Sequence, residues 1–289
     1  METVGVIGLG KIGLRIADNL IKSGYRVVGY RRHAMTEFAS LGGKPADSPA
    51  DVGAAADIVF SCLPSAQALD EVFQGPHGLV HSARPGQILV ELGSYQLPVK
   101  ERQIAPLAAK GAAFIDGEVA GTPGIVGERK GVVFLAGDPD ACVRVERVVA
   151  GFADSCFYFG AFGAATKVKL INNLLVAVHI AATAEAMALG LKAGVNVDMM
   201  IKAIAAGSGG STQFAIRAPR MAERRFLPPK EPRRRCGTTS RRSTHSPRAP
   251  AWRRQCVIAP PSCLSTASTW AWASMMSRSW STCFPLFRA

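Results

Sequence analysis

Apolar residues in the first half of the chain fall into short runs, separated by stretches in which apolar residues repeat at helical intervals. Strand-like runs stand at 3–7, 26–30, 57–62, 87–91, 113–116 and 131–136, and several of the segments between them have helical periodicity. Strands that alternate with helices along a chain usually join one sheet, with helices on both of its faces. The pattern therefore predicts an α/β fold with a mostly parallel, doubly wound sheet.

A different pattern follows the last of these runs. Residues 163–194 read GAATKVKLINNLLVAVHIAATAEAMALGLKAG, a stretch rich in helix formers with glycine at both ends. We expect one helix, about 45 Å long at roughly 1.5 Å per residue, that leaves the sheet domain and begins an all-helical domain. The expected domains are 1–163 and 164–228. Lys169 and Asn173 share a face of this helix with Asn172 beside them, whereas Lys167 points nearly the opposite way.

The first apolar run passes directly into the turn GLGKIG, whose glycines have the GxGxxG spacing of the Rossmann dinucleotide-binding fold. The first glycine allows the tight turn, the second lets the backbone approach a pyrophosphate, and the third lets helix and strand pack closely. Alone, the motif also fits any tight strand-to-helix turn, but the strand at 26–30 completes the expected βαβ unit. We expect the cofactor to lie against Gly8, Leu9, Gly10, Lys11, Ile12 and Gly13.

The second strand ends in Tyr30, Arg31 and Arg32. A cofactor with a free ribose hydroxyl usually meets an acidic residue at this place, whereas a ribose 2′-phosphate requires arginine. The two arginines therefore favour NADP(H) over NAD(H). A solvated basic loop is the alternative interpretation.

Other strand ends supply further candidates, because ligands of such sheets lie outside the carboxyl ends of the strands. By this rule Leu63, Pro64 and Ser94 should flank the cofactor, and Ser94 could hydrogen-bond the ribose or the substrate. Ser65 fits a structural turn as well. The glycine-rich segment 116–131, expected to be a loop, could cradle a carboxylate with its backbone amides, or could simply be a flexible turn.

Together, GLGKIG, YRR, DGEVAGTPG and GAFGAATKVKLINN resemble the 3-hydroxyisobutyrate dehydrogenase, or β-hydroxyacid dehydrogenase, family, relatives of 6-phosphogluconate dehydrogenase. The resemblance covers about residues 3–228. It implies a Rossmann domain, a long interdomain helix and an all-helical domain. It also implies that Lys169 stands at the catalytic lysine position and Asn173 at the asparagine one turn later, with Asn172 added beside them.

The chain departs from the family pattern in two places. The substrate loop, usually Asp-Ala-Pro-Val-Ser-Gly-Gly, reads Asp-Gly-Glu-Val-Ala-Gly-Thr over residues 116–122. Ala120 replaces the serine that would bind the substrate carboxylate, so the loop candidates are Ala120, Gly121 and Thr122, with Thr122 as the alternative hydroxyl. In the helix motif the second glycine becomes Ala165, a change compatible with a helix.

The chemistry that the resemblance implies needs a group that accepts a hydroxyl proton while a hydride leaves the same carbon. A lysine performs this role when its pKa falls from about 10.4 toward neutrality. Lys169 is the candidate, and Asn173 would hold the reacting oxygen or the lysine. We interpret His179 as a core or interface residue and Glu185 as a packing-region or dimer-contact carboxylate. No metal-ligand spacing stands out, and none of the seven cysteines forms a CxxC pair.

Charge is distributed unevenly along the chain. The net charge is +13, but residues from Lys230 onward hold one Lys and ten Arg against a single Glu, which leaves +3 for the first 229 residues. The same segment holds all four tryptophans and has no apolar periodicity. We interpret 229–289 as an out-of-pattern, disordered basic tail, of the composition expected when GC-rich coding DNA is translated out of frame. The competing hypothesis is that this segment is an arginine-rich arm that binds nucleic acid or anionic lipid. The tryptophans and cysteines scattered through the segment argue against such an arm.

The leading functional prediction is hydride transfer between NADP(H) and a small 3-hydroxy acid or its semialdehyde. The alternatives are an imine reductase-like relative, against which Lys169 speaks, and a cofactor-binding but inactive product of a disrupted gene. We expect a homodimer if the helical domain forms. We also expect a cytoplasmic location, because METVGVIGLG enters the first strand directly and no long apolar run lacks a polar interruption.

Overall fold

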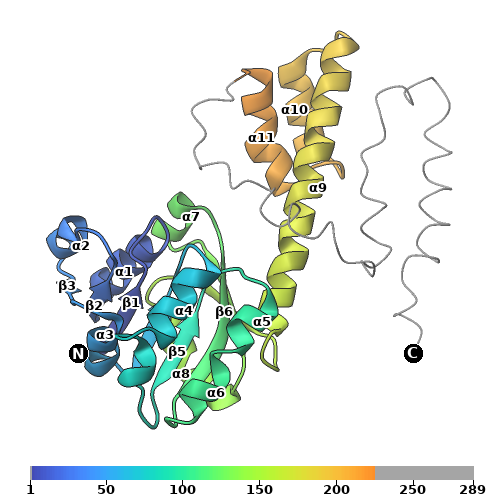
Figure 1. The fold of residues 1–289 in the computed structure, drawn as a ribbon. Helices are drawn as coiled ribbons and strands as arrows, with labels where there is room; N and C mark the ends of the chain where they lie inside the picture. The colour runs from blue at the N-terminus through green and yellow to red at the C-terminus, as the bar shows by residue number, and fades with distance from the viewer. Residues whose placement is uncertain (1, 225–289) are drawn as a thin grey trace, which may run out of the picture. The chain divides into compact units, whose positions relative to one another are not determined.

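The computed structural model describes residues 2–224, which lie in one compact unit, Met1–Arg225. The predictions for 229–289, a disordered basic tail and a shifted reading frame, fall outside the described residues. Within the unit an α/β domain is followed by a long helix and two shorter ones (Figure 1).

One eight-stranded sheet forms the centre of the α/β domain. Its order is β3-β2-β1-β4-β5-β6-β7-β8, and neighbouring strands are parallel except for the antiparallel pair β6 and β7. Because β1 pairs with β2 on one side and with β4 on the other, the strand order reverses between β1 and β4, where doubly wound sheets bind ligands. The strands are β1 Thr3–Ile7, β2 Arg26–Tyr30, β3 Lys44–Pro45, β4 Ile58–Ser61, β5 Ile88–Glu91, β6 Ala113–Ala120, β7 Val132–Ala136 and β8 Ser155–Tyr158.

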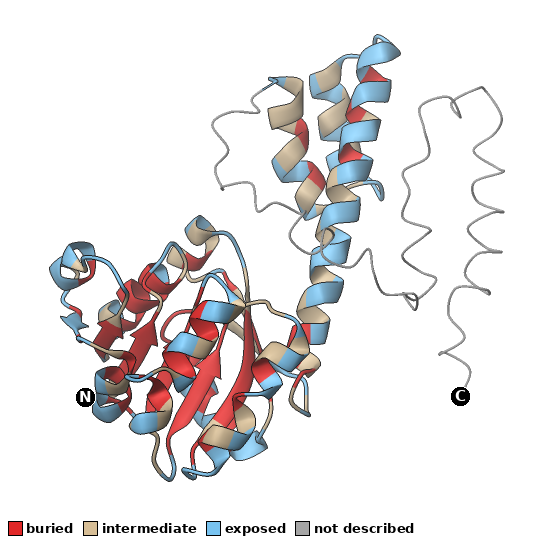
Figure 2. Cartoon of the chain, in the orientation of Figure 1, coloured by how far each residue is buried: buried red, intermediate tan, exposed pale blue. Residues whose placement is uncertain are grey.

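Helices cover both faces of the sheet, as the alternation of elements predicts. Apolar residues of α1, α2 and α8 pack on one face, and those of α3, α4 and α6 on the other. Side chains alternate across each strand, so β4 contributes Phe60 to the first core and Val59 to the second. The central strands are buried between the two helical layers, as their red colour in Figure 2 shows. The helices are α1 Gly13–Lys22, α2 Thr36–Ser40, α3 Pro49–Ala55, α4 Ala66–Gln74, η1 Leu79–His81, α5 Leu97–Glu101, α6 Ile104–Ala108, α7 Pro123–Gly127, α8 Pro139–Val149, α9 Ala164–Lys192, α10 Val197–Ala206 and α11 Thr212–Ala222.

The glycine-rich segment 116–131 differs from the loop expected. Its first five residues continue β6 to Ala120, because β7 runs antiparallel beside them with Asp116 opposite Ala136 and Ala120 opposite Val132. The short helix α7 occupies the next part of the segment. Only the residues around α7 are therefore irregular, and Asp116 and Glu118 lie on a strand rather than in a loop.

The long helix α9 begins where the sequence predicts. Gly163 adopts φ +92°, which favours glycine, and the helix continues without a break to Lys192. Residues of α10 and α11 pack around Met187, whereas Leu170, Ile171, Leu174 and Leu175 are at least half exposed. Among the described residues, α9 is long and apolar enough to cross a membrane, judged by its length and composition alone. The core helices of soluble proteins meet the same two criteria, so this is weak evidence for a membrane span. The expected absence of a membrane segment therefore stays a prediction.

Candidate active site

The glycine turn lies at the point where the strand order reverses. Gly8 has φ +88°, and a Cβ there would lie 2.2 Å from the carbonyl oxygen of Cys62, at the end of β4. A Cβ on Gly13 would lie 2.2 Å from the carbonyl oxygen of Gly8. A Cβ on the exposed Gly10, in contrast, would meet no atom within 4 Å. The fold itself therefore requires glycine at positions 8 and 13. Glycine at position 10 keeps open the space that a pyrophosphate needs.

The remaining residues of the turn have different environments. Leu9 is fully buried in the core, Lys11 is exposed, and Ile12 is partly buried against the core. The backbone N–H of Gly8 donates to the carbonyl oxygen of Tyr30 at 2.9 Å, which joins the turn to the end of β2. Backbone amides and the side chain of Lys11 are therefore the groups that this turn can offer a phosphate.

The two arginines after β2 are not equivalent. Arg31 Nη1 donates to the carbonyl oxygen of Leu9 at 3.0 Å, and Arg31 Nε donates to that of Ala34 at 2.8 Å. The guanidinium of Arg31 therefore lies against the glycine turn. Arg32 is more exposed and forms an ion pair with Glu71 at 3.4 Å. Arg31 is the better placed of the two to meet a cofactor bound at this turn.

The predicted residues at other strand ends lie in the same part of the domain. Leu63 is buried and its carbonyl oxygen accepts from the Tyr95 hydroxyl at 2.6 Å, whereas Pro64 is exposed. The hydroxyl of Ser65 accepts from the N–H of Ala68 at 3.1 Å, so Ser65 is the N-cap of α4. This is a structural role in the turn, which was one of the two interpretations of Ser65. Ser94 follows β5 and its hydroxyl donates to Glu118 Oε2 at 2.5 Å.

Lys169, in the second turn of α9, is joined to β6. Its Nζ donates to the carbonyl oxygen of Val119 at 2.6 Å, and its side chain is partly buried. Asn173, one turn later, is exposed, and Asn172 Nδ2 donates to Asn173 Oδ1 at 3.4 Å. The predicted face of α9 thus begins at the sheet with the lysine and continues outward with the two amides.

The last predicted residues follow the end of β6. Ala120 is the final residue of the strand and is partly buried, and Gly121 is exposed. Thr122 is exposed and its hydroxyl accepts from the N–H of Ile125 at 3.5 Å, so it caps α7. Because Lys169 contacts Val119, the residue just before Ala120, this segment lies next to the lysine.

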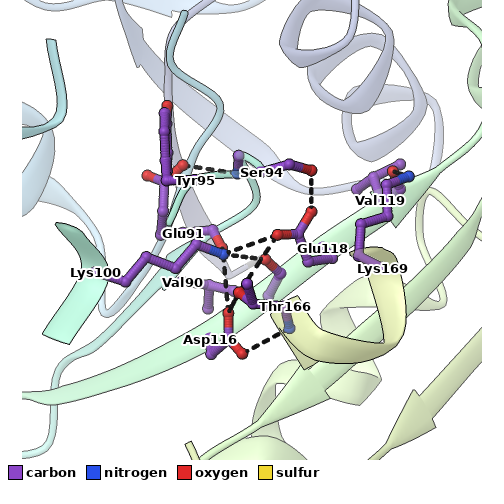
Figure 3. A network of polar contacts seen from close by, with 12 residues as sticks. Val90, Glu91, Ser94, Tyr95, Lys100, Asp116, Glu118, Val119, Thr166 and Lys169 are labelled. Atoms are coloured by element: carbon purple, nitrogen blue, oxygen red, sulfur yellow. Dashed lines mark hydrogen bonds and ion pairs between the residues drawn. The ribbon is translucent and has the colours of Figure 1, made fainter. Parts of the chain in front are cut away.

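A buried cluster of charged side chains lies beneath these residues (Figure 3). Lys100 of α5 is fully buried, and its Nζ donates to Asp116 Oδ1 at 2.8 Å, to the carbonyl oxygen of Gly117 at 3.0 Å and to Glu118 Oε1 at 3.2 Å. Glu91, at the end of β5, is buried as well and accepts from the Ser61 hydroxyl and from the N–H of Gly93. The cluster therefore contains three carboxyl groups around one lysine.

Asp116 also joins the sheet to α9. Its Oδ2 accepts from the backbone N–H of Thr166 at 2.9 Å, and its Oδ1 accepts from the Thr166 hydroxyl at 2.6 Å. Thr166 is the third residue of α9, so its N–H lacks a partner within the helix. A carboxylate at this end also interacts favourably with the helix dipole. Asp116 thus fixes the start of the helix that bears Lys169.

Burial disfavours the ionised forms of two carboxyl groups of the cluster, those of Glu91 and Glu118. It raises the pKa of Glu91 from 4.5 to about 7, against the charge of Lys100 and the hydrogen bonds from Ser61 and Gly93. It also raises the pKa of Glu118, against the charge of Lys100, the hydrogen bond from Ser94 and the charge of Lys169. Glu91 and Glu118 therefore retain their protons at higher pH than exposed glutamates do.

Sequence reasoning did not single out Lys100 or Glu91, and it treated Glu118 only as a loop residue. A charged residue at the end of the apolar run ILVE is one signal that could have been followed for Glu91. Asp116 and Glu118 are two residues apart, so on a strand they share a face. Lys100 carries no comparable local signal, since its partners lie 16 to 18 positions away.

The comparisons with known proteins agree with this geometry. Residues 3–160 match the model of the NAD binding domain of 6-phosphogluconate dehydrogenase. Residues 163–230 match that of the NAD-binding domain of NADP-dependent 3-hydroxyisobutyrate dehydrogenase. The first match covers the sheet and its glycine turn, and the second begins at the residue before α9. The fold and the two matched domains are those of NAD(P)-dependent oxidoreductases of the hydroxyacid dehydrogenase type.

Named relatives have the same character. The chain is 34% identical over 230 residues to L-threonate dehydrogenase of Cupriavidus necator, with 78% of this chain and 77% of the relative covered. It is 31% identical over 208 residues to mitochondrial 3-hydroxyisobutyrate dehydrogenase of Rattus norvegicus, with 71% and 62% covered. The chain belongs to the 3-hydroxyisobutyrate dehydrogenase, or β-hydroxyacid dehydrogenase, family. It spans less than two thirds of the length of the rat enzyme.

Solved structures show the same fold. The 3-hydroxyisobutyrate dehydrogenase of Salmonella typhimurium matches with a TM-score of 0.69 and 25% identity, covering 79% of this chain and 81% of the other. An imine reductase from Myxococcus stipitatus matches with a TM-score of 0.66 and 20% identity, covering 80% of each chain. At that identity the second likeness concerns the fold alone. The predicted family, fold class and NAD(P) binding are confirmed, and the hydroxyacid dehydrogenase interpretation is better supported than the imine reductase one.

Proposed function

We propose that the protein transfers a hydride between NADP(H) and a small 3-hydroxy acid or the matching semialdehyde, with Lys169 as the general acid and base. The observation that supports this most directly is the bond from Lys169 Nζ to the carbonyl oxygen of Val119, next to the predicted substrate segment. Family membership supports the reaction class, and the names of the relatives support a hydroxy acid as substrate.

The glycine turn and Arg31 would hold the cofactor. The open space at Gly10 fits a pyrophosphate, and the amides at the start of α1 would meet its charge. Arg31, bonded to Leu9 at the same turn, would bind the ribose 2′-phosphate, which is the reason for preferring NADP(H). Leu63, Pro64 and Ser94 would line the remainder of the cofactor site. When bound, the nicotinamide supplies the acceptor or the donor of the hydride.

Lys169 would handle the proton. In the oxidation direction its neutral amine removes the hydroxyl proton, so an O–H bond breaks and an N–H bond forms as the C–H hydride leaves. In the reduction direction the ammonium returns that proton to the carbonyl oxygen. The carbonyl oxygen of Val119, which accepts from Nζ, orients the amine toward the sheet end where the cofactor would lie. Asn173, one turn later, would donate to the same substrate oxygen.

The segment after β6 would bind the acid group of the substrate. Backbone amides around Gly121 can donate to a carboxylate without a serine hydroxyl at position 120. Asn172 would contribute from α9. Because Ala120 lacks a hydroxyl, we expect weaker hold on the carboxylate than a serine would give, and therefore a substrate with a further polar group. L-threonate, named for one relative, is a compound to test first.

The test combines cofactor binding with turnover on a panel of 3-hydroxy acids and semialdehydes. We expect NADPH to bind more tightly than NADH and Lys169→Ala to lower kcat by about 10²- to 10⁴-fold while NADPH binding persists. Lys167→Ala, on the other side of the helix, is the matched control and should retain activity. Turnover undiminished in Lys169→Ala would contradict the assignment, and cofactor binding with no turnover on any compound would favour an inactive protein.

A homodimer and a cytoplasmic location complete the proposal. The exposed apolar residues of α9, among them Leu174 and Leu189, are the surface on which a second copy would pack. Sedimentation of the full chain would show whether it associates. A strictly monomeric chain would remove this part of the proposal.

A further inference from the structure

The buried cluster contains more acid than base. Glu91, Asp116 and Glu118 surround the single Lys100, and all four residues are fully buried. Asp116 is committed to Lys100 and to the start of α9, where Thr166 provides two hydrogen bonds. Glu91 is held by Ser61 and Gly93 on the β5 side. Neither of these carboxyl groups is bonded to a residue of the proposed reaction site.

Glu118 is different, because its carboxylate links the cluster to that site. Oε1 accepts from Lys100 at 3.2 Å, and Oε2 accepts from Ser94, a predicted cofactor neighbour, at 2.5 Å. The next residue, Val119, accepts from Lys169 Nζ. Figure 3 shows Glu118 bonded to both Lys100 and Ser94, and Lys169 bonded to Val119. The charge of Lys169 lowers the pKa of Glu118, and this effect is smaller than those of burial, Lys100 and Ser94. Glu118 also stands where the family's loop pattern has proline.

We propose that Glu118, paired with Lys100 and oriented by Ser94, is a positioning residue that stabilises the protonated form of Lys169. The inference rests on the proposed function, in which Lys169 alternates between amine and ammonium. The amine of Lys169 is bonded to the carbonyl oxygen of Val119, the residue after Glu118. A carboxylate at the neighbouring residue favours the ammonium, so it assists proton removal from an alcohol and opposes proton return to a carbonyl. Lys100 stabilises the buried negative charge of Glu118 by its ion pair with Oε1, whereas Ser94 is bonded to the other oxygen, Oε2.

The groups that act on Glu118 come from several elements. Lys100 on α5 and Lys169 on α9 favour its ionised form, and Asp116 lies on the same face of β6. Glu91 on β5 lies close enough that its own pKa responds to Glu118. A substitution at Glu118 therefore changes the electrostatic environment of all four of these side chains. For this reason the measurement must report on the protonation of Lys169 alone.

Amine labelling provides that measurement without turnover. The full chain is labelled with trace acetic anhydride from pH 6 to 11, and the modified fraction of Lys169 is quantified by peptide mass spectrometry. In Glu118→Gln, which keeps size and hydrogen-bonding capacity but removes the charge, we expect the midpoint of Lys169 labelling to fall by about one pH unit. Glu101→Gln, on the exposed side of α5, is the matched control and should leave the midpoint unchanged. A Glu118→Gln midpoint equal to that of the unmodified chain would overturn the proposal.

A second variant covers the case in which Glu118→Gln does not fold. Ser94→Ala removes the donor to Oε2 but leaves the side chain of Glu118 and its pair with Lys100 in place. In the proposal Ser94 orients the carboxylate, so without this bond Glu118 is held less firmly and acts less on Lys169. The midpoint of Lys169 labelling should therefore again fall, by less than in Glu118→Gln. An unchanged midpoint in folded Ser94→Ala would likewise count against the proposal.

Turnover separates this inference from the proposed function. If the chain oxidises a hydroxy acid, the acid limb of its kcat profile should move to lower pH in Glu118→Gln, together with the labelling midpoint. If no hydroxy acid reacts, the proposed function fails, and the labelling midpoint still decides the relation between Glu118 and Lys169. A role in stability alone would lower the melting temperature without moving either quantity.

Discussion

The carboxylate of Asp116 accepts two hydrogen bonds from Thr166, one from the backbone N–H and one from the hydroxyl. The two residues are 50 positions apart in the sequence. This pair joins the sheet to the helix that carries the proposed catalytic lysine. The same carboxylate faces Lys100, so a single side chain both caps α9 and neutralises a buried ammonium.

Asp116→Asn should therefore be strongly destabilising. Asparagine keeps the shape but removes one charged acceptor of Lys100, which among the described residues retains only Glu118 as an ion-pair partner, and a hydrogen bond to a charged group contributes about 1.5–3 kcal/mol. Urea unfolding followed by circular dichroism gives the free energy of unfolding. Thr166→Val, which removes only the hydroxyl donor, should cost about 1 kcal/mol. Equal losses in the two variants would show that the Lys100 pair contributes little.

The glycines of the cofactor turn should separate folding from binding. Gly8→Ala and Gly13→Ala each place a Cβ 2.2 Å from a backbone oxygen, so both should lower the melting temperature. Gly10→Ala adds a methyl group where no atom lies within 4 Å. It should leave the melting temperature unchanged and weaken NADPH binding roughly tenfold, a loss of about 1.4 kcal/mol. Undiminished NADPH binding in Gly10→Ala would mean that the cofactor does not approach this turn.

Arg31 should set the preference between the two nicotinamide cofactors. A charge-assisted hydrogen bond is worth about 1.5–3 kcal/mol, so Arg31→Ala should weaken NADPH binding roughly ten- to hundredfold and NADH binding little. Arg32→Ala, which releases only an exposed ion pair to Glu71, should have the smaller effect. Fluorescence titration with both cofactors measures this. An equal loss for both would indicate that Arg31 acts by supporting the turn through Leu9.

The pH dependence of stability should reveal Glu91. Its pKa is raised from 4.5 to about 7 in the folded protein, so the folded state holds a proton that the unfolded state has released in this interval. The resulting stabilisation is complete below pH 4.5 and is lost as the pH rises to about 7. Glu118 changes in the same direction.

We therefore expect the free energy of unfolding to fall between pH 5 and pH 7.5 by an amount on the order of 1–3 kcal/mol from this residue. Glu91→Gln, which stays neutral, should flatten the curve. Urea titrations at four pH values compare the two proteins. Parallel curves would show that Glu91 does not titrate in this interval.

Local patterns were sufficient to predict the elements that position the cofactor. The strands Thr3–Ile7 and Arg26–Tyr30 and the long helix agree with the expected ranges, because each is defined by its own residues and bounded by glycine or by a charged residue. The antiparallel pairing of β7 could not be predicted, since strand direction depends on which partner is available. Its consequence, the extension of β6 through Glu118 to Ala120, was missed for the same reason.

The buried cluster shows a different limit. Lys100 and Glu118 are charged, and charged residues are usually exposed, so their types alone place them on the surface. They are buried because each supplies the other's counter-charge across two elements. Such pairs become visible only when α5 and β6 are brought together in the fold.

Because α9 is bonded to the sheet at its start, a movement of its far end displaces the residues near Thr166 only slightly. Lys169 lies three residues beyond Thr166, about 4.5 Å along the axis, whereas Lys192 lies about 39 Å from it. If the helix pivots at Thr166, a 3 Å displacement of its far end moves the backbone at Lys169 by only about 0.3 Å. The position of the Lys169 amine should therefore change little with whatever packs on the distal turns, including a partner subunit that is absent or bound in a different orientation.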